Sequence, residues 1–464
     1  KVAPIRIPAF SNSGAAVVKI PEDTILLDRA LRAARDTKFL SVARGACRGA
    51  GSLFSLAFDA PAAVVIADDN TFAAAGAAVL DSLRAAGIAC EAPFLFGREV
   101  WAEYDFVEQL QAALSQTPAI PVAVGSGTIN DLTKLAAHRL ARPYMVVATA
   151  ASMDGYTAFG ASITAAGSKQ TFECPAPRAV AADLDVIARA PREMNASGYA
   201  DLLAKGVAGA DWILADAAGE EPIAPDVWAT VQERLPVWIE SPRGIANGEP
   251  DTVRRLIEGL LMSGFAMQAA QSSRPASGAE HQFSHLWDMQ HHLHNGVAPS
   301  HGFKVAMGTL ASLDLYEVLS RRDFTRLDVD EAVRAWPRWE RVESRIAALF
   351  AGALAKKALE ETRAKHPPKD VLRRQLCRLR DEWPALRERL QRQLQPFRQA
   401  RSLLAAAGCP TTSEQIGISG ERLRQSYELA YYIRRRFTVL DFAMRTGTFQ
   451  SAVDELVATE RRAK

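Results

Sequence analysis

The chain has 464 residues, of which 48% are hydrophobic and 23% are charged, with a formal net charge of +2. This length predicts two or three domains, and the small net charge gives no electrostatic reason to expect binding to nucleic acid or to a membrane surface. No stretch approaches the ~20 apolar residues that span a bilayer, and five scattered cysteines indicate reduced thiols, so we expect a cytoplasmic protein without membrane insertion.

The first part of the chain alternates short apolar runs with helical patterns. Residues 1–60 are expected to be irregular, apart from a helical segment around residues 27–36. Apolar runs predict strands at residues 62–67, 93–96, 120–124 and 145–149, and a helix is expected over 72–86. Strands that alternate with helices predict a parallel sheet, so residues 1–190 are assigned to an α/β domain.

Beyond about residue 195 the strand patterns stop, and residues 191–464 are predicted to be all-helical. The expected helices cover residues 201–215, 251–271, 277–288, 302–319, 346–358, 370–397 and 419–436. The last of these are rich in arginine. Because Asp and Glu are interspersed among the arginines, a solvated helix face is favoured over a nucleic-acid surface.

A glycine turn in residues 121–134 connects an apolar strand to the start of a helix. Glycine lets the backbone approach a pyrophosphate closely, and the free N–H groups at a helix N-terminus attract its charge. The pattern Gly125-Ser-Gly127 is not GxGxxG, so a purely structural turn stays open as an alternative. Asp68 follows an earlier strand, where it suits either a hydrogen bond to an adenosine ribose or a role in forming the turn.

Two carboxylates stand in positions that suit chemistry. Asp154 lies in residues 148–156, which follow a strand and so reach the carboxyl edge of the sheet, where α/β proteins bind ligands. An ordinary loop explains this segment equally well. Asp201 lies among Ala, Leu and Gly early in an apolar helix, and a buried carboxylate needs a partner. Lys205, one turn later, favours a salt bridge, and a metal ion is the other candidate partner.

Six of the eight histidines lie between residues 281 and 301. Imidazole ligates divalent metals and titrates near neutral pH, so this density indicates a metal or proton-transfer site. Ser277 and Glu280 have capping-box spacing, which predicts a helix start near Ser277 and places His281 and His285 on one helix face.

His301 opens the next predicted helix. Together with His281 and Asp201 it would form a three-ligand site with an open position, as catalytic metals use. The remaining histidines of the cluster are expected to be solvated at a helix end; they are His291, His292 and His294.

Five motifs occur in the order of a known family, at residues 125–131, 152–156, 198–205, 272–285 and 300–304. With them the chain resembles the sn-glycerol-1-phosphate dehydrogenases, in particular the bacterial AraM-like branch. These enzymes belong to the iron-containing alcohol dehydrogenase and dehydroquinate synthase-like superfamily. The resemblance covers roughly residues 60–320, and residues 435–441 also resemble that branch. It implies an α/β nucleotide-binding domain over 1–190, an all-α metal-binding domain over 191–464, and an active site between them.

The resemblance implies a role for each matching residue. Asp201, His281 and His301 would ligate the metal, while His285 would contact substrate or relay a proton and Asp154 would contact substrate or nicotinamide. The implied cofactor-binding residues are Asp68, Gly125, Gly127, Thr128, Ile129, Asn130, Asp131, Thr149, Ala150, Ala151, Ser152 and Ala158. Ala158 is a departure, because the family often has serine at that position.

The implied reaction is the NAD(P)H-linked reduction of dihydroxyacetone phosphate to sn-glycerol 1-phosphate, with one divalent metal (zinc, nickel or iron) and a homodimeric enzyme. Asp154, Asp201 and His285 would contact the substrate. Arg274 is the first candidate for its phosphate, because a planar guanidinium suits phosphate oxygens; Lys205 and Lys304 are the other cations. Asp68 favours NADH, since a carboxylate repels a 2′-phosphate.

Three alternatives remain open from the sequence. The first is a sugar-phosphate cyclase of the dehydroquinate synthase type, which has the same fold, metal and NAD but restores the cofactor in each turnover. The second is a dehydrogenase for another alcohol, polyol or phosphonate. The third is a non-enzymatic binding or regulatory protein.

Overall fold

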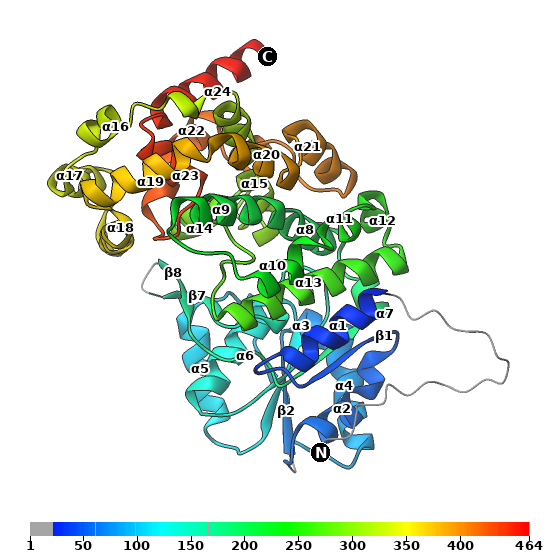
Figure 1. Ribbon diagram of the computed structural model, residues 1–464. Helices are drawn as coiled ribbons and strands as arrows, with labels where there is room; N and C mark the ends of the chain where they lie inside the picture. Colours follow the sequence, from blue (N-terminus) through cyan, green and yellow to red (C-terminus); the bar gives the residue numbers. More distant parts are fainter. Residues whose placement is uncertain (1–21, 61, 98, 166–167, 464) are drawn as a thin grey trace.

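The computed structural model describes residues 22–60, 62–97, 99–165 and 168–463 (Figure 1). A parallel sheet with its helices forms one end of the molecule, coloured blue to cyan, and helices coloured green to red form the other. The last strand of the sheet is β9 (Ala179–Asp183), and in the described part of the chain only helices and their connections follow it. The predicted order, α/β and then all-α, is confirmed. The predicted boundary at residue 190 falls between α7 (Leu184–Ala188) and α8 (Arg192–Leu203), and as a domain boundary it stays a prediction.

The main sheet has seven described strands, all paired in parallel, in the order β1-β9-β6-β5-β2-β3, with β4 also paired to β2. Besides β9, the strands are β1 (Phe39–Ala43), β2 (Ala62–Ala67), β3 (Ala89–Cys90), β4 (Phe94–Leu95), β5 (Ile120–Gly125) and β6 (Met145–Ala148). A separate antiparallel hairpin, β7 (Ala161–Ala165) and β8 (Ser168–Phe172), follows β6 in the chain.

Helices cover both faces of the sheet, as a parallel sheet requires. In β5, Val122 and Val124 pack with the cluster of α2 (Ala50–Ala57) and α4 (Ala77–Ala85), whereas Ala123 packs with α5 (Tyr104–Leu114) and α6 (Gly127–Arg139). This alternation follows from the two-residue period of a strand. The other N-terminal elements are α1 (Glu22–Ala33), η1 (Ala46–Gly49), α3 (Asp69–Thr71), η2 (Phe72–Gly76) and η3 (Gly155–Thr157).

The prediction that residues 1–60 are irregular is wrong for the described part of that range; residues 1–21 lie outside the described residues. β1 and α2 form regular structure there. The five residues of β1 are all half-buried, because the strand lies at the edge of the sheet. An edge strand lacks the continuous apolar run that marks a central one.

The second half of the chain is a set of packed helices. They are α9 (Lys205–Ala218), α10 (Pro225–Gln232), α11 (Leu235–Trp238), α12 (Pro242–Asn247), α13 (Pro250–Ala270), α14 (Ala279–Met289), α15 (His301–Ser320), η4 (Phe324–Arg326), α16 (Val329–Ala335), α17 (Trp339–Leu349), α18 (Gly352–Lys365), α19 (Lys369–Asp381), α20 (Trp383–Gln393), α21 (Phe397–Ala406), η5 (Ser413–Ile416), α22 (Gly420–Tyr432), α23 (Val439–Arg445) and α24 (Phe449–Ala463).

Two of the predicted long helices are interrupted. The helix expected over 346–358 is divided between α17 and α18, where Gly352 has a positive φ of 57°. The helix expected over 370–397 ends at Asp381, and α20 begins with proline in its first turn. Proline lacks an N–H and clashes with the preceding turn, so it starts a helix more readily than it continues one.

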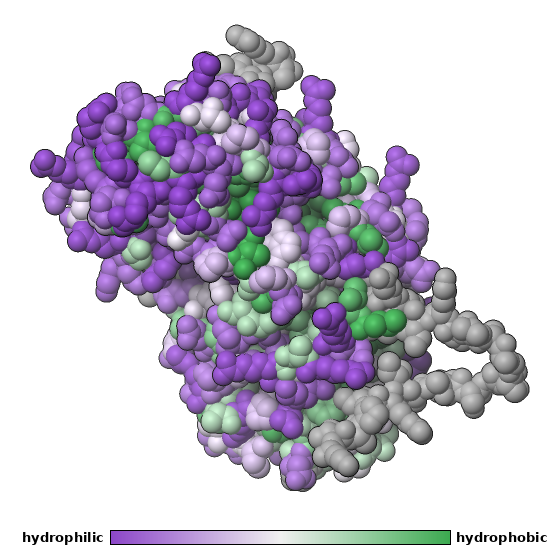
Figure 2. Space-filling view, viewed as in Figure 1, coloured by the Kyte–Doolittle hydropathy of each residue, from purple (hydrophilic) through white to green (hydrophobic). Residues whose placement is uncertain are grey.

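The surface over the C-terminal helices is mostly hydrophilic in the view of Figure 2. Its arginines pair with acids: Arg345 with Glu428 at 2.7 Å, Arg374 with Asp370 at 3.0 Å, and Arg392 with Glu388 at 3.0 Å. This pairing is consistent with the predicted solvated faces. Among the described residues, no helix has both the length and the apolar character that crossing a membrane requires.

Candidate active site and metal centre

Asp201, His281 and His301 come together from three helices. Asp201 lies on α8, His281 lies on α14, and His301 is the first residue of α15. Each offers one ligand atom, and these atoms all lie within 4.8 Å of one another. Nε2 of His281 is 3.5 Å from Oδ1 of Asp201. One carboxylate and two imidazoles suit zinc, nickel or iron(II) and leave coordination positions open.

Two glycines let these helices approach closely. A Cβ atom on Gly198 of α8 would lie 1.8 Å from the carbonyl oxygen of Ala151, in the loop after β6. A Cβ atom on Gly302 of α15 would lie 1.9 Å from the carbonyl oxygen of Ser197. Only glycine fits at such distances. Gly198 therefore holds α8, which carries Asp201, against the loop after β6.

The sequence did not predict that the carboxylate of Glu280 contacts His281. Its Oε1 lies 2.8 Å from Nδ1 of His281 and accepts a hydrogen bond from the backbone N–H of Gly278 at 2.6 Å. The predicted capping box is absent, because the N-cap of α14 is Gly278 and not Ser277. A carboxylate on Nδ1 turns Nε2 toward the metal position. Burial favours the neutral ring, but hydrogen bonds that the ring donates to the carboxylates of Asp201 and Glu280 outweigh it and raise the pKa of His281.

A buried ammonium joins Asp201 to Asp154. Nζ of Lys205 is 2.7 Å from Oδ1 of Asp201 and 2.7 Å from Oδ2 of Asp154, and it donates to the carbonyl of Ala276 at 3.0 Å. Burial disfavours the charged ammonium, yet the two carboxylates outweigh it and raise the pKa of Lys205. The sequence left two candidate partners for the Asp201 carboxylate, a salt bridge to Lys205 or a metal ion. In the structure this carboxylate contacts Lys205 and also lies beside His281, a candidate metal ligand. Since Lys205 is fully engaged by these partners, it is not the cation for a substrate phosphate.

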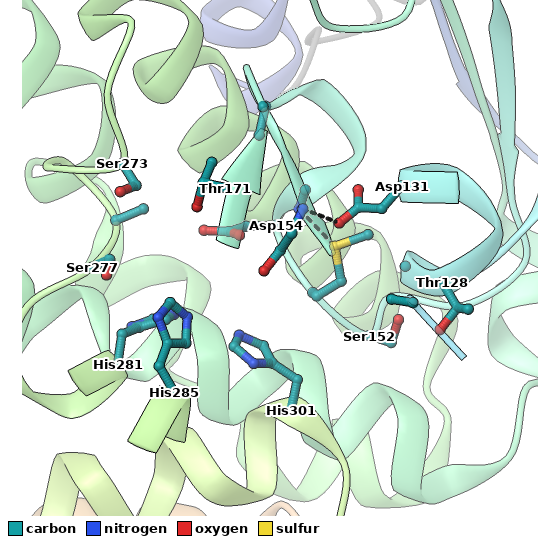
Figure 3. A pocket seen from close by; sticks show the side chains of 18 of the residues that line it. Thr128, Asp131, Ser152, Asp154, Thr171, Ser273, Ser277, His281, His285 and His301 are labelled. Carbon is teal, nitrogen blue, oxygen red and sulfur yellow. Dashed lines mark hydrogen bonds between the residues drawn. The ribbon is translucent and has the colours of Figure 1, made fainter. Parts of the chain in front are cut away.

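The two predicted catalytic residues, His285 and Asp154, both line one cavity (Figure 3). The ring of His285 lies one turn after His281, with centroids 6.0 Å apart, and 6.5 Å from the ring of His301. Burial, and next the positive charge of Arg434, lower the pKa of His285 well below its usual value. The imidazole of His285 is therefore neutral near pH 7.

The cavity has a volume of about 410 Å³. Ser126, Gly127 and Thr128 line one end, where α6 begins. Backbone N–H groups at the start of such a helix favour an anion, for example a pyrophosphate. Of the predicted cofactor residues, those that line the cavity are Gly127, Thr128, Asp131, Ser152 and Ala158.

The other predicted cofactor residues lie outside this lining; they are Asp68, Gly125, Ile129, Asn130, Thr149, Ala150 and Ala151. Several of them fix the loops instead. The carbonyl of Gly125 accepts the N–H of Thr149 at 3.1 Å. Oδ1 of Asp68 accepts the N–H of Thr71 at 2.8 Å and caps α3, which is the turn-forming role. Contact between Asp68 and a ribose stays a prediction.

The structure does not bring Arg274, the predicted phosphate-binding residue, to the cavity. Its side chain is 1% exposed, does not line the cavity, and donates to the carbonyls of Phe437 at 2.9 Å and Asp211 at 3.0 Å. Nε of Arg274 lies 3.2 Å from Glu221. Through these contacts the guanidinium of Arg274 connects α9 to the segment before α23. Lys304, the remaining predicted cation, pairs with Asp288 and also lies outside the lining.

His292 is buried, although the sequence predicts that it is solvated. Its Nε2 lies 2.6 Å from the carbonyl of Ile416, and its Nδ1 lies 2.7 Å from Arg422. His291 is exposed, as expected. His292 therefore holds the loop after α14 in place and takes no part in the cavity.

The described cations that do line the cavity are Lys169, on β8, and Arg434, after α22. Neither residue was predicted from the sequence to have a role in the site. Residues 434–436 lie within a pattern that predicts one continuous helix, whereas α22 ends at Tyr432. Arginines 434–436 therefore lie beyond the end of the helix. The feature of the sequence that could have indicated their role is a run of three arginines among apolar residues.

Comparisons with known proteins agree with this architecture. Residues 41–191 match the model of the iron-containing alcohol dehydrogenase family. The glycerol-1-phosphate dehydrogenase (NAD(P)+) of Geobacillus stearothermophilus is 31% identical over 82% of this chain and 85% of its own length. The protein of the same name from Halalkalibacterium halodurans is 37% identical over 56% of this chain and 65% of its own length.

Two solved structures share the fold. A probable glycerol dehydrogenase from Sinorhizobium meliloti has a TM-score of 0.60 at 16% identity, covering 91% of this chain and 98% of that one. Glycerol dehydrogenase from Schizosaccharomyces pombe has a TM-score of 0.57 at 18% identity and covers 91% of both chains. The fold is thus that of the alcohol dehydrogenases with a parallel sheet followed by a helical half. Within that class, the chain belongs to the glycerol-1-phosphate dehydrogenase family.

Proposed function

We propose that this protein catalyses the NAD(P)H-linked, metal-dependent reduction of dihydroxyacetone phosphate to sn-glycerol 1-phosphate, and the reverse reaction. The observation that carries the proposal is the convergence of Asp201, His281 and His301 beside a cavity that also reaches the start of α6. Relatives named as glycerol-1-phosphate dehydrogenases favour this reaction over the cyclase alternative.

Asp201, His281 and His301 would hold one divalent metal, zinc or nickel before iron, and the residues at the start of α6 would hold the dinucleotide. Burial lowers the pKa of His301 to about 3, and binding of a metal would displace the proton that Asp201 and Glu280 favour on His281. When bound, the metal supplies Lewis acidity at a carbonyl and the nicotinamide supplies a hydride. A homodimer and a cytoplasmic location stay predictions.

The chain's own residues supply charge balance and a proton path. Lys205 pairs with both Asp154 and Asp201 and offsets part of their negative charge, while burial and the charge of Asp201 still raise the pKa of Asp154. The neutral ring of His285 holds a proton on one nitrogen and accepts one on the other. It can therefore pass a proton to the oxygen at C2 during reduction and take it back during oxidation.

An assay of NADH oxidation at 340 nm tests the proposal. Protein freed of metal is mixed with dihydroxyacetone phosphate, and zinc, nickel or iron(II) is added separately. We expect NADH consumption only with metal, and we expect His281→Ala to lose both bound metal and turnover. His138→Ala is the matched control, because His138 is an exposed residue in the last turn of α6. Turnover by His281→Ala at full metal occupancy would refute the ligand assignment, and absence of net NADH loss with every metal would refute the reaction.

A further inference from the structure

The end of the cavity away from α6 contains polar groups that the proposed function has not yet used. Ser273 and Ser277, between α13 and α14, line this end together with Arg434. Figure 3 shows the two serines on the left, on the far side of His285 from Thr128. The candidate metal centre therefore lies between a nucleotide end and this serine end.

Arg434 and Arg436 organise the two serines. Arg434 donates to Oγ of Ser277 at 3.0 Å and to Oγ of Ser273 at 3.0 Å, and Arg436 donates to the same Ser273 oxygen at 3.0 Å. Because each serine oxygen accepts these bonds, its own hydroxyl hydrogen remains available to donate. A guanidinium beside two hydroxyl donors is a set that suits the oxygens of a tetrahedral anion.

The positive charge of Arg434 is only partly compensated by protein groups, because burial and Arg274 oppose its charged form while Glu361 and Glu280 favour it. Among the described residues, no carboxylate lies within 4 Å of the Arg434 guanidinium, whereas Nζ of Lys169 is 3.8 Å from Oδ2 of Asp288. Burial, and next the nearby charges of Arg434 and Arg274, lower the pKa of Arg436 well below its usual value. Arg274 is buried and Arg434 and Arg436 are half-buried; these neighbouring guanidiniums repel one another, so an anion bound here would stabilise them.

We propose that Ser273, Ser277 and Arg434 form the subsite for the phosphate ester of the substrate. This inference rests on the proposed function. A three-carbon substrate with its carbonyl at the metal centre and its cofactor toward α6 would extend its phosphate toward the serines. The segment after α22, and not Arg274, would therefore bind the phosphate.

Substitution of Arg434 tests the subsite in two independent ways. Arg434→Met removes the guanidinium, and Arg424→Met is the matched control, because Arg424 lies on α22 and contacts Asp454 at 3.4 Å, outside the cavity. Titration calorimetry measures inorganic phosphate binding to the metal-loaded protein. Steady-state kinetics measure the ratio of kcat/KM for dihydroxyacetone phosphate to kcat/KM for unphosphorylated dihydroxyacetone. We expect Arg434→Met to lower phosphate affinity and this ratio by about 10- to 100-fold, and Arg424→Met to leave both as in the wild type.

The outcomes separate this inference from the proposed function. If the wild type does not reduce dihydroxyacetone phosphate, the proposed function fails, and the calorimetric titration still decides the subsite. Phosphate binding that is equal in the wild type and Arg434→Met, or absent in the wild type, overturns it. A rise in KM for NADH instead of the substrate also overturns it, because the anion would then be the cofactor's. Should Arg434→Met not fold, Arg434→Lys and Ser273→Ala provide the same comparison, with a loss of at least threefold expected and no loss counting against the subsite.

Discussion

Glu280 offers a direct test of how the metal centre is organised. Its Oε1 accepts hydrogen bonds from Nδ1 of His281 at 2.8 Å and from the N–H of Gly278 at 2.6 Å, and the carboxylate is fully buried. Loss of such an outer partner typically weakens metal binding 10- to 100-fold, which corresponds to about 1.4–2.7 kcal/mol. Glu280→Ala removes both contacts and should weaken metal binding by a factor near the upper end of this range. Glu280→Gln keeps a carbonyl acceptor and should weaken metal binding by a factor near the lower end of this range.

Stability should respond differently from metal affinity. Glu280→Ala leaves the buried N–H of Gly278 without a partner, which costs about 1–3 kcal/mol in the free energy of unfolding. Burial, and next the charge of Glu280, raise the pKa of Asp211 to about 7. Above pH 7 the two carboxylates therefore repel each other, and Glu280→Gln removes that repulsion. We expect Glu280→Gln to lose metal affinity at pH 8 without losing stability in the metal-free state.

The assay is a zinc titration of metal-free protein in competition with a chromophoric chelator. Ser284→Ala is the matched control, because Ser284 is buried on the same helix and its hydroxyl has no hydrogen-bond partner among the described residues. The control should bind zinc as the wild type does. Zinc affinity of Glu280→Ala within about twofold of the wild type would refute the view that this carboxylate orients His281 for a metal.

Two further predictions concern stability. Gly198→Ala should lower the free energy of unfolding by about 3 kcal/mol or more in urea titrations, because its Cβ would lie 1.8 Å from the carbonyl oxygen of Ala151. The control is Gly206→Ala, whose Cβ would meet nothing closer than 3.9 Å and which should be neutral or slightly stabilising. Equal effects of the two substitutions on the free energy of unfolding would contradict the packing argument. Burial opposes ionisation of Glu361, but Arg435 and Lys357 outweigh it and lower its pKa from 4.5 to about 2. Because the pKa is lowered in the folded state, this carboxylate stabilises the fold above about pH 4.5 and stops doing so as the pH falls toward 2. Glu361→Gln should therefore cost about 1–3 kcal/mol at pH 7, and a deficit that did not shrink in acid would contradict this account.

The central strands could be predicted because both faces of the sheet are covered. β2 has the predicted bounds, residues 62–67, and its last five residues are fully buried, so its sequence is apolar throughout. β1 could not be predicted in the same way, since its five residues are half-buried at the edge of the sheet. The helix breaks near Gly352 and before α20 depend on local backbone geometry, which helical periodicity does not report.

The site could be predicted as far as residue spacing determines it. The four-residue separation of His281 and His285 places both on one face of α14, and both line the cavity. Side-chain direction is not contained in such a pattern. Arg274 lies in the right segment, yet its guanidinium turns inward to the carbonyls of Phe437 and Asp211. Arg434, distant in sequence, reaches the cavity because α22 ends before it.

Contacts within the protein join the two halves of the site. Lys205 links Asp154, in the loop after β6, to Asp201 on α8, with both distances at 2.7 Å. Without this ammonium, the buried carboxylate of Asp201 would face the partly buried carboxylate of Asp154, and an unpaired buried charge costs several kcal/mol. The absence of a side chain at Gly198 sets the distance between the same loop and α8 from the other side. Asp201 is thus placed by Lys205 as His281 is placed by Glu280, so the affinity of the centre for metal depends on these neighbours as well as on its ligands.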